Sequence, residues 1–344
     1  MTDLRPAYDD LPVSGEQASN LTYFAFAKAH QAAPVPAPPR TVSALPNVLA
    51  GRYRIERLLG AGGMGAVYRA RDLLHEQFGD PEPYIALKIL NEEFVESPDA
   101  SALLYTEFAL TRRLRHNNVL RLHTFEVDTH CQRAFITMEL MSGVTLDKLL
   151  CERPMGLPWA ELRNIALPLL DALAYIHARG VLHGDLKPSN VMVTEEGLRL
   201  FDFGLGQAED GILNGLPQLS RERFNAWTPG YAAPELLEGH PLSASTDVYA
   251  IACVLYELAQ GKTPFGRTPS NQIQYRRLQA PRHLPKHCWP ALRAALNDDA
   301  AQRTITARQL HDAMAVTSFW GQGWLWCLKS SGTKTYLNPR GISL

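Results

Sequence analysis

The chain has 344 residues, a formal net charge of −1 and a hydrophobic share of 46%. This length exceeds one modest domain and favours a two-lobed unit with flanking tails, and the apolar share suffices for a large core. A nearly neutral chain has no global field that attracts nucleic acid or an anionic membrane, so we expect neither partner.

Cysteine usage and hydropathy predict a cytoplasmic protein. The five cysteines are scattered and form no CxxC pair, which disfavours a zinc site and fits thiols in a reducing compartment. The amino terminus lacks the charged start and apolar run of a signal peptide. No unbroken apolar window is long enough to span a bilayer, so we expect no transmembrane segment.

Two flanking segments differ in composition from the rest of the chain. Residues 1–48 contain the proline-rich run Pro34–Pro39 and little periodicity, which predicts a flexible leader. Residues 317–344 form a tail that begins with a tryptophan-rich stretch, 319–328. We expect these aromatic side chains to pack onto the folded body, with a partner or membrane-surface anchor as the alternative. The folded unit is expected over 49–316.

A glycine-rich loop connects two expected strands, Arg52–Leu59 and Ala66–Arg71. The pattern GxGxxG alone is a weak signal, because dinucleotide-binding folds use it to lead into a helix. The residues after this loop are β-like, so we favour strand, loop and strand, with a plain glycine-rich hairpin as the alternative. The loop consists of Gly60, Ala61, Gly62, Gly63, Met64 and Gly65.

A third strand is expected over Tyr84–Leu90, where alternation places Lys88 between apolar neighbours. An ammonium group in that position is costly unless an anion meets it. The helical pattern between about residues 100 and 114 contains Glu107 within an apolar, core-facing stripe. We therefore predict an ion pair between Lys88 and Glu107, with two independent surface charges as the alternative.

The remaining pattern predicts two more strands followed by a mainly helical half. The strands are expected over Val119–Val127 and Arg133–Leu140, and the strongest helices over Glu161–Ala178 and Thr246–Ala259. Pro168 lies inside the first helical pattern and should bend that helix or shift its start.

Two short polar connections between apolar, strand-like pieces carry the densest chemistry. They are residues 183–190, HGDLKPSN, and residues 202–204, DFG. One carboxylate can orient a hydroxyl group, while the other carboxylate and an amide can hold a hard cation through oxygen. A polar turn between strands is the alternative. The groups concerned are the side chains of Asp185, Lys187, Asn190 and Asp202.

These motifs resemble those of the protein kinase family, over residues from about 52 to 316. The resemblance implies an α+β, bilobal, protein-kinase-like fold. A small, mainly antiparallel β lobe with one key helix would cover 49–141, and a larger, mainly helical lobe 144–316. It also implies transfer of the γ-phosphoryl group of ATP to serine or threonine hydroxyls of proteins, including autophosphorylation. Within the family the chain looks most like bacterial Hanks-type kinases.

The resemblance gives each polar residue a role. Asp185 would orient the attacking hydroxyl group, and Lys187 would steady the phosphoryl group in transfer. Asn190 and Asp202 would bind Mg²⁺, or Mn²⁺ in its place. The aspartate Asp247 resembles the buried family residue that braces the catalytic loop, and it can also cap its helix.

The same resemblance implies an ATP site between the lobes. Lys88, held by Glu107, would position the α and β phosphates. Met138 would be the gatekeeper, and Glu139–Met141 would be the hinge that binds adenine. Residues expected around ATP are Leu59, Gly60, Ala61, Gly62, Gly63, Met64, Gly65, Val67, Ala86, Lys88, Met138, Glu139, Met141 and Met192.

Residues 228–235, TPGYAAPE, resemble the segment on which protein kinases bind a peptide's serine or threonine. Thr228 would contact the catalytic aspartate and lysine. Glu235 would pair with Arg303, because a buried carboxylate would otherwise lack a partner. Trp227 replaces the glycine that usually precedes this threonine, so the shape of the segment could differ.

Two alternatives stay open. The HGD sequence at 183–185 also resembles aminoglycoside and choline kinases, which act on small molecules but lack the 228–235 segment. A pseudokinase or scaffold would bind partners without catalysis, although every residue that the chemistry requires is present.

Gly184 stands where many kinases have an arginine that grips a phosphorylated activation loop. Glycine cannot make that contact, and the stretch 205–227 holds a single hydroxyl residue, Ser220. We predict that activity depends weakly, or not at all, on phosphorylation of this stretch, so that a Ser220→Ala variant phosphorylates protein at close to the unmodified rate. A loss of about tenfold, about 1.4 kcal/mol in the barrier, would contradict this expectation.

Overall fold

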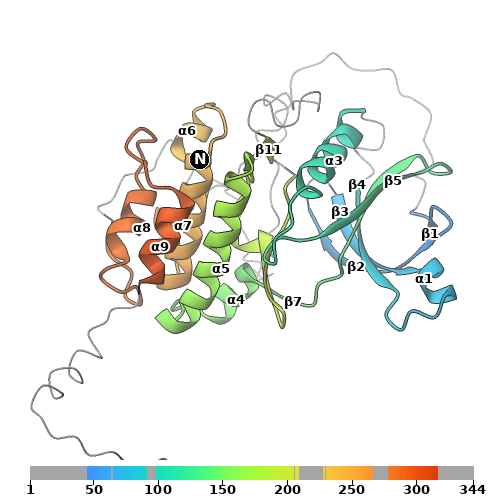
Figure 1. Cartoon of the computed structure of the whole chain (residues 1–344), viewed down its shortest axis with the longest axis horizontal. Coiled ribbons are helices and arrows are strands. Elements are labelled where there is room, and N and C mark those ends of the chain that lie inside the picture. The colour runs from blue at the N-terminus through green and yellow to red at the C-terminus, as the bar shows by residue number, and fades with distance from the viewer. Residues whose placement is uncertain are drawn as a thin grey trace, which may run out of the picture.

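The computed structural model describes residues 45–62, 65–90, 98–204, 206–208, 228, 230–265 and 278–316. A sheet-rich lobe and a helical lobe lie side by side (Figure 1). The elements are β1 Val48–Leu49, β2 Tyr53–Ala61, β3 Gly65–Asp72, α1 Leu73–Gln77, β4 Tyr84–Leu90, α3 Pro98–Thr111, β5 Leu122–Asp128, β6 Arg133–Met138, β7 Gly143–Thr145, α4 Leu146–Glu152, α5 Trp159–His177, β8 Val181–Leu182, the 3₁₀ turn η1 Pro188–Asn190, β9 Val191–Thr194, β10 Gly197–Leu200, β11 Gln207–Ala208, α6 Pro234–Leu237, α7 Ala244–Gln260, α8 Trp289–Ala295 and α9 Ala307–Ala315.

The small lobe is built on a six-stranded antiparallel sheet in the order β1-β2-β3-β4-β6-β5. Both faces of β4 are covered, as the predicted alternation requires. Ala86 and Leu90 join an apolar cluster with Phe108 of α3, while Leu87 and Ile89 join a second cluster on the opposite face. Lys88 therefore points to the face that α3 covers.

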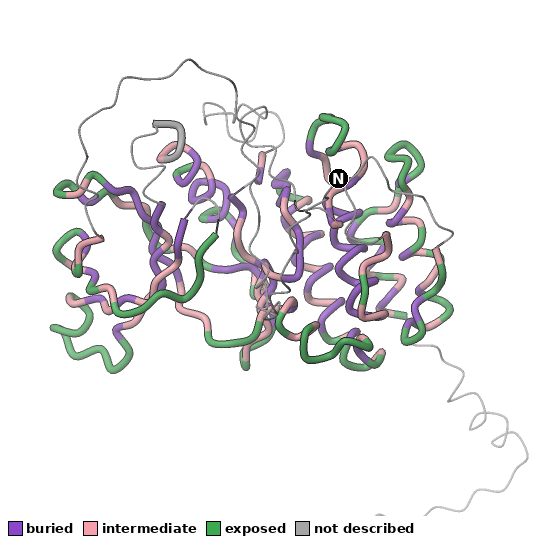
Figure 2. Tube along the Cα trace, turned by 180° about the vertical axis from the view of Figure 1, so that it is seen from behind, coloured by how far each residue is buried: buried purple, intermediate pink, exposed green. Residues whose placement is uncertain are grey.

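The large lobe is held together by helices that pack around α7. Burial is continuous along this helix, which lies in the middle of the lobe (Figure 2). Its start carries a capping box between Ser243 and Thr246, and its end is closed by Gly261 at a φ of 78°. The other expected helix is α5, which starts at Trp159 and continues through Pro168 because its apolar stripe is buried.

Several of the expected strands differ from the structure at their ends. Gly60 and Ala61 belong to β2 and Gly65 to β3, although all three were expected in the loop. The largest difference concerns β5. The pattern from Val119 predicted strand structure, but β5 begins only at Leu122. Val119 instead forms a bridge with Leu200, and the Leu120 backbone N–H donates to the Leu200 carbonyl oxygen at 2.9 Å. Pairing with β10 of the other lobe thus competes with the sheet for these residues. No helix within the described ranges is long and apolar enough to cross a membrane.

Asp128 ties two turns of the small lobe together. Its carboxylate accepts backbone N–H groups of Ala50 at 2.6 Å, His130 at 2.8 Å and Cys131 at 3.0 Å. Burial of this carboxylate is outweighed by these donors, which lower its pKa to about 2.

An Asp128→Asn variant should therefore be less stable than the unmodified protein at pH 7, by about 1–2 kcal/mol. Because the folded-state pKa lies below the ordinary value of about 3.9, the stabilisation is present above about pH 4 and lost toward pH 2. Denaturant unfolding at several pH values should show the two proteins converging as pH falls. A difference that stays constant down to pH 2 would contradict this account.

Candidate active site

The first part of the site is a cluster of one ammonium and two carboxylate groups, in which Lys88 and Glu107 are largely buried and the Asp202 side chain is 38% exposed. Lys88 Nζ lies 2.8 Å and 2.7 Å from the two carboxylate oxygens of Glu107 on α3, so the structure contains the predicted ion pair. Lys88 Nζ also lies 2.7 Å from Asp202 Oδ1. Sequence reasoning missed this contact, since 114 positions separate the two residues and no periodic pattern links them.

Burial and charge act against each other in this cluster. Burial disfavours the Lys88 ammonium, but the carboxylates of Asp202 and Glu107 outweigh it and raise its pKa. Burial raises the pKa of Glu107 despite the nearby ammonium. For Asp202 the ammonium outweighs burial and lowers the pKa to about 2, so this carboxylate is ionised and available to a cation.

The second part is a triangle of side chains at the start of the 183–190 loop. Asp185 accepts a hydrogen bond from Thr228 Oγ1 at 2.9 Å through Oδ1 and lies 2.6 Å from Lys187 Nζ through Oδ2. Lys187 Nζ also donates to Thr228 Oγ1 at 3.2 Å. These are the contacts predicted for Thr228, and they place a hydroxyl group directly against the carboxylate.

Asn190 links the two parts. Its Nδ2 donates to the Asp185 carbonyl oxygen at 2.9 Å, and its own carbonyl oxygen accepts the Phe201 N–H at 3.0 Å, next to Asp202. No described residue donates to its side-chain oxygen. Asp202 has a φ of 66°, a conformation that costs energy for a residue with a side chain. An amide oxygen and an ionised carboxylate on neighbouring backbone fit a hard divalent cation.

A buried carboxylate on α7 holds the backbone of the 183–190 loop in place. Asp247 on α7 accepts the His183 N–H at 2.8 Å and the Gly184 N–H at 3.0 Å. His177 Nε2 lies 3.0 Å from the same carboxylate. Burial is outweighed by these partners, which lower the pKa of Asp247. The structure thus contains the bracing contacts that were predicted for this residue.

His183 is a neutral part of this framework. It is fully buried, and burial lowers its pKa. Its Nε2 lies 3.1 Å from the Phe201 carbonyl oxygen, and its Nδ1 accepts the Asp185 N–H at 3.3 Å, which together fix one tautomer. Its ring also lies 4.6 Å from the buried ring of Phe203. The ring therefore aligns the two polar connections with each other.

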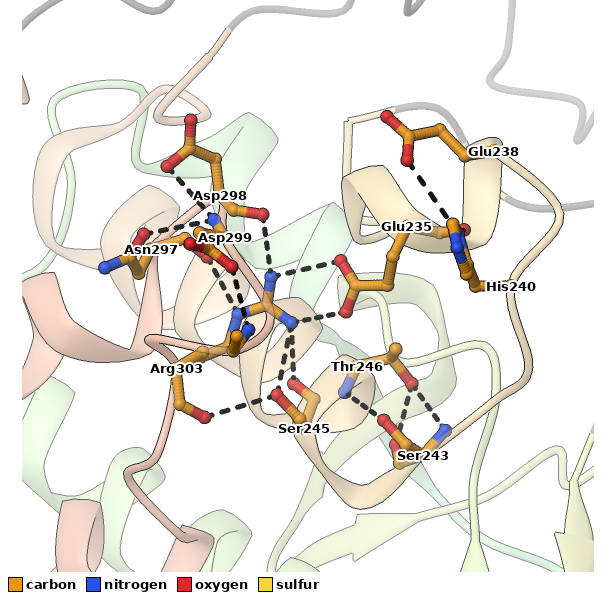
Figure 3. A network of polar contacts seen from close by, with 11 residues as sticks. Glu235, Glu238, His240, Ser243, Ser245, Thr246, Asn297, Asp298, Asp299 and Arg303 are labelled. Carbon is orange, nitrogen blue, oxygen red and sulfur yellow. Dashed lines mark hydrogen bonds and ion pairs between the residues drawn. The ribbon is translucent and has the colours of Figure 1, made fainter.

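A buried ion pair anchors the segment that contains Thr228. Arg303 Nη1 lies 2.6 Å and Nη2 3.1 Å from the two oxygens of Glu235, as predicted (Figure 3). The arginine side chain is 0% exposed. Its remaining N–H groups reach the carbonyl oxygens of Ser245, Asn297 and Asp298. Every described donor of this buried cation is satisfied, which is the condition for such a pair to be stable.

Apolar residues expected around adenine lie together on the sheet. Ala86 and Met138 are partners on β4 and β6, and Val67 and Met141 pack against the same cluster. Met192 lies on β9. At the hinge, no described residue bonds to the Glu139 carbonyl oxygen or the Met141 N–H. In the glycine loop, Gly63 and Met64 lie outside the described residues, as does Ser220 of the segment 205–227.

A family model for the protein kinase domain matches residues 53–313. The chain belongs to the protein kinase family. Membership implies use of ATP and a divalent metal ion, and it agrees with the expected bilobal fold.

Known kinases from bacteria are similar to this chain. Serine/threonine-protein kinase PkaA of Streptomyces coelicolor is 32% identical over 265 residues, covering 73% of this chain and 47% of PkaA. PknA of Mycobacterium tuberculosis is 30% identical over 280 residues, covering 78% of this chain and 61% of PknA. The chain thus spans less than two thirds of either relative. The crystal structure of the M. tuberculosis PknI kinase domain is 28% identical with a TM-score of 0.58, covering 79% of this chain and 98% of that domain.

Proposed function

We propose that this chain is a cytoplasmic, ATP-dependent serine/threonine protein kinase that uses Mg²⁺, with Mn²⁺ as a substitute. The observation that carries the proposal is the Asp185–Lys187–Thr228 triangle, linked through Asn190 to the Lys88–Asp202 contact. Four free cysteines among the described residues fit a reducing compartment. We assign 49–316 to the kinase unit, with 1–48 as a leader and 317–344 as a tail.

In this proposal each residue has one task. Asp185 orients the substrate hydroxyl group, which would donate to its carboxylate in the way that Thr228 Oγ1 does in this structure. Lys187 and Lys88 stabilise phosphate charge, and the oxygen atoms of Asn190 and Asp202 hold the metal ion, which would neutralise phosphate charge. Such chemistry depends on positioning and electrostatics, for which rigid, braced connections are sufficient.

Adenine would lie between the β4–β6 cluster and Met192. The Glu139 carbonyl oxygen and the Met141 N–H, which have no partner among the described residues, supply one acceptor and one donor at the hinge. This is the pairing that an adenine amino group and an adjacent ring nitrogen require. Met138 closes the pocket behind it. The glycine loop, including Gly60 and Gly62, would cover the phosphates.

The proposal is tested by incubating the purified chain with radiolabelled ATP and either Mg²⁺, Mn²⁺ or a chelator, in parallel reactions with a generic basic protein, choline or an aminoglycoside as the acceptor. We expect label on serine and threonine in both metals and none with the chelator. Label on choline or an aminoglycoside, with none on protein, would show the small-molecule alternative. No transfer to either substrate class would favour the pseudokinase alternative. The contacts of Thr228 favour the protein substrate, because they tie the 228–235 segment to Asp185.

A further inference from the structure

A cavity of about 240 Å³ lies between the end of α5, the start of α7 and the start of α9. Its walls are largely apolar and include Ala174, Val248, Ile305 and Ala307, with His177 among them. Ligand pockets begin at about 300 Å³, so this space is better matched to a single large side chain than to a small-molecule ligand.

The tail of the same chain begins within reach of this cavity. Helix α9 lies antiparallel to α5, since Arg163 near the start of α5 donates to the carbonyl oxygen of Ala315 at 3.1 Å. The cavity is at the other end of this helix pair, and the nine residues of α9 span about 14 Å. An extended chain covers about 3.3 Å per residue. Trp320 could thus barely return to the cavity, whereas Trp324 is the first tryptophan of the tail that reaches it with length to spare.

His177 offers a hydrogen-bond partner that suits an indole ring. Its Nε2 is engaged with the carboxylate of Asp247, which fixes the proton on that nitrogen when the ring is neutral. No described residue bonds to its Nδ1, which is then left as an acceptor. An indole has an apolar body and a single N–H donor, and a buried indole N–H usually finds an acceptor.

We propose that the Trp324 indole docks in this cavity and that the 319–328 segment thereby covers the α5–α7–α9 junction. His177 then contacts the docked tail on one side and Asp247 on the other. Because Asp247 holds the backbone of His183 and Gly184, the cavity is one residue removed from the brace of the catalytic loop.

A matched set of tail variants tests the docking without any use of catalysis. We expect Trp324→Ala in the full chain to lower the melting temperature by roughly 5 °C or more, because a large buried side chain is lost. Trp320→Ala, at a position that can barely return to the cavity, should leave it unchanged within about 1 °C. Equal effects of the two substitutions, or no effect of Trp324→Ala, would overturn the proposal.

A crosslink tests the location. Thr304 is exposed at the cavity, and the native Cys327 lies three positions after Trp324. In a Cys151→Ser background, Thr304→Cys should form an intramolecular disulfide with Cys327 under mild oxidation, detected by mass spectrometry of proteolytic fragments. Adding Trp324→Ala should abolish it, and Val127→Cys, 49% exposed in the small lobe, should not form one. A disulfide between two chains, a crosslink that survives Trp324→Ala, or an equal yield from Val127→Cys would overturn the assignment.

Discussion

An Asp185→Asn variant should phosphorylate protein at least about 10³-fold more slowly than the unmodified chain, with ATP affinity within a few-fold. Asparagine keeps the size of the side chain but removes the charge that faces Thr228 and Lys187. General-base or orienting groups contribute about 10²–10⁴-fold in rate. The measurement is the initial rate of label transfer to a basic protein at saturating ATP.

The control for this variant is Asp312→Asn on α9. This aspartate is 65% exposed and forms an ion pair with its neighbour His311, so its removal should leave the rate unchanged within about twofold. Nucleotide titration of both variants separates a loss of chemistry from a loss of binding. If Asp185→Asn keeps more than a tenth of the rate, the residue does not act as proposed.

Of the substitutions that we propose, Arg303→Met should destabilise the fold most. It should lower the free energy of unfolding by about 3–5 kcal/mol. It removes a cation with 0% exposure and leaves the Glu235 carboxylate without its bidentate partner. The melting temperature should fall by about 10 °C for a chain of this size.

Two further variants separate the ion pair from general loss of packing. Arg308→Met removes an arginine that is 52% exposed and paired with Asp171, and it should cost about 0–1 kcal/mol. The double substitution of Arg303→Met with Glu235→Leu should recover part of the loss, because no buried charge is left unpaired. Equal melting temperatures for Arg303→Met and Arg308→Met would show that the pair is not structurally important.

Local periodicity predicted those parts of the site that depend on one element. The alternation of β4 and the helical stripe around Glu107 were enough to place an ammonium opposite a carboxylate. The same reasoning gave the extent of β4 and approximate limits of α5 and α7. These features are decided by burial of one face, which repeats along the sequence.

Contacts between distant, irregular segments had no such signal. The approach of Asp202 to Lys88 depends on the positive φ at Asp202 and on the way the lobes face each other. Pairing of Leu120 with Leu200 shortened an expected strand, because the two lobes compete for the same backbone groups. The contacts of Thr228 and of Arg303 came from the family resemblance, since spacing along the chain does not give them.

The helix that carries Glu107 ends inside the core of the opposite lobe. Leu110 and Leu114 near its end belong to the apolar cluster of the large lobe, together with Val119. A movement of this helix away from Lys88 would therefore remove apolar side chains from a packed core. If the chain acts as the proposed kinase, the Lys88–Glu107 contact is therefore expected to persist without an activating signal. Because Gly184 has no side chain to bind a phosphorylated loop, we expect control to come from an element that obstructs the site rather than from one that assembles it.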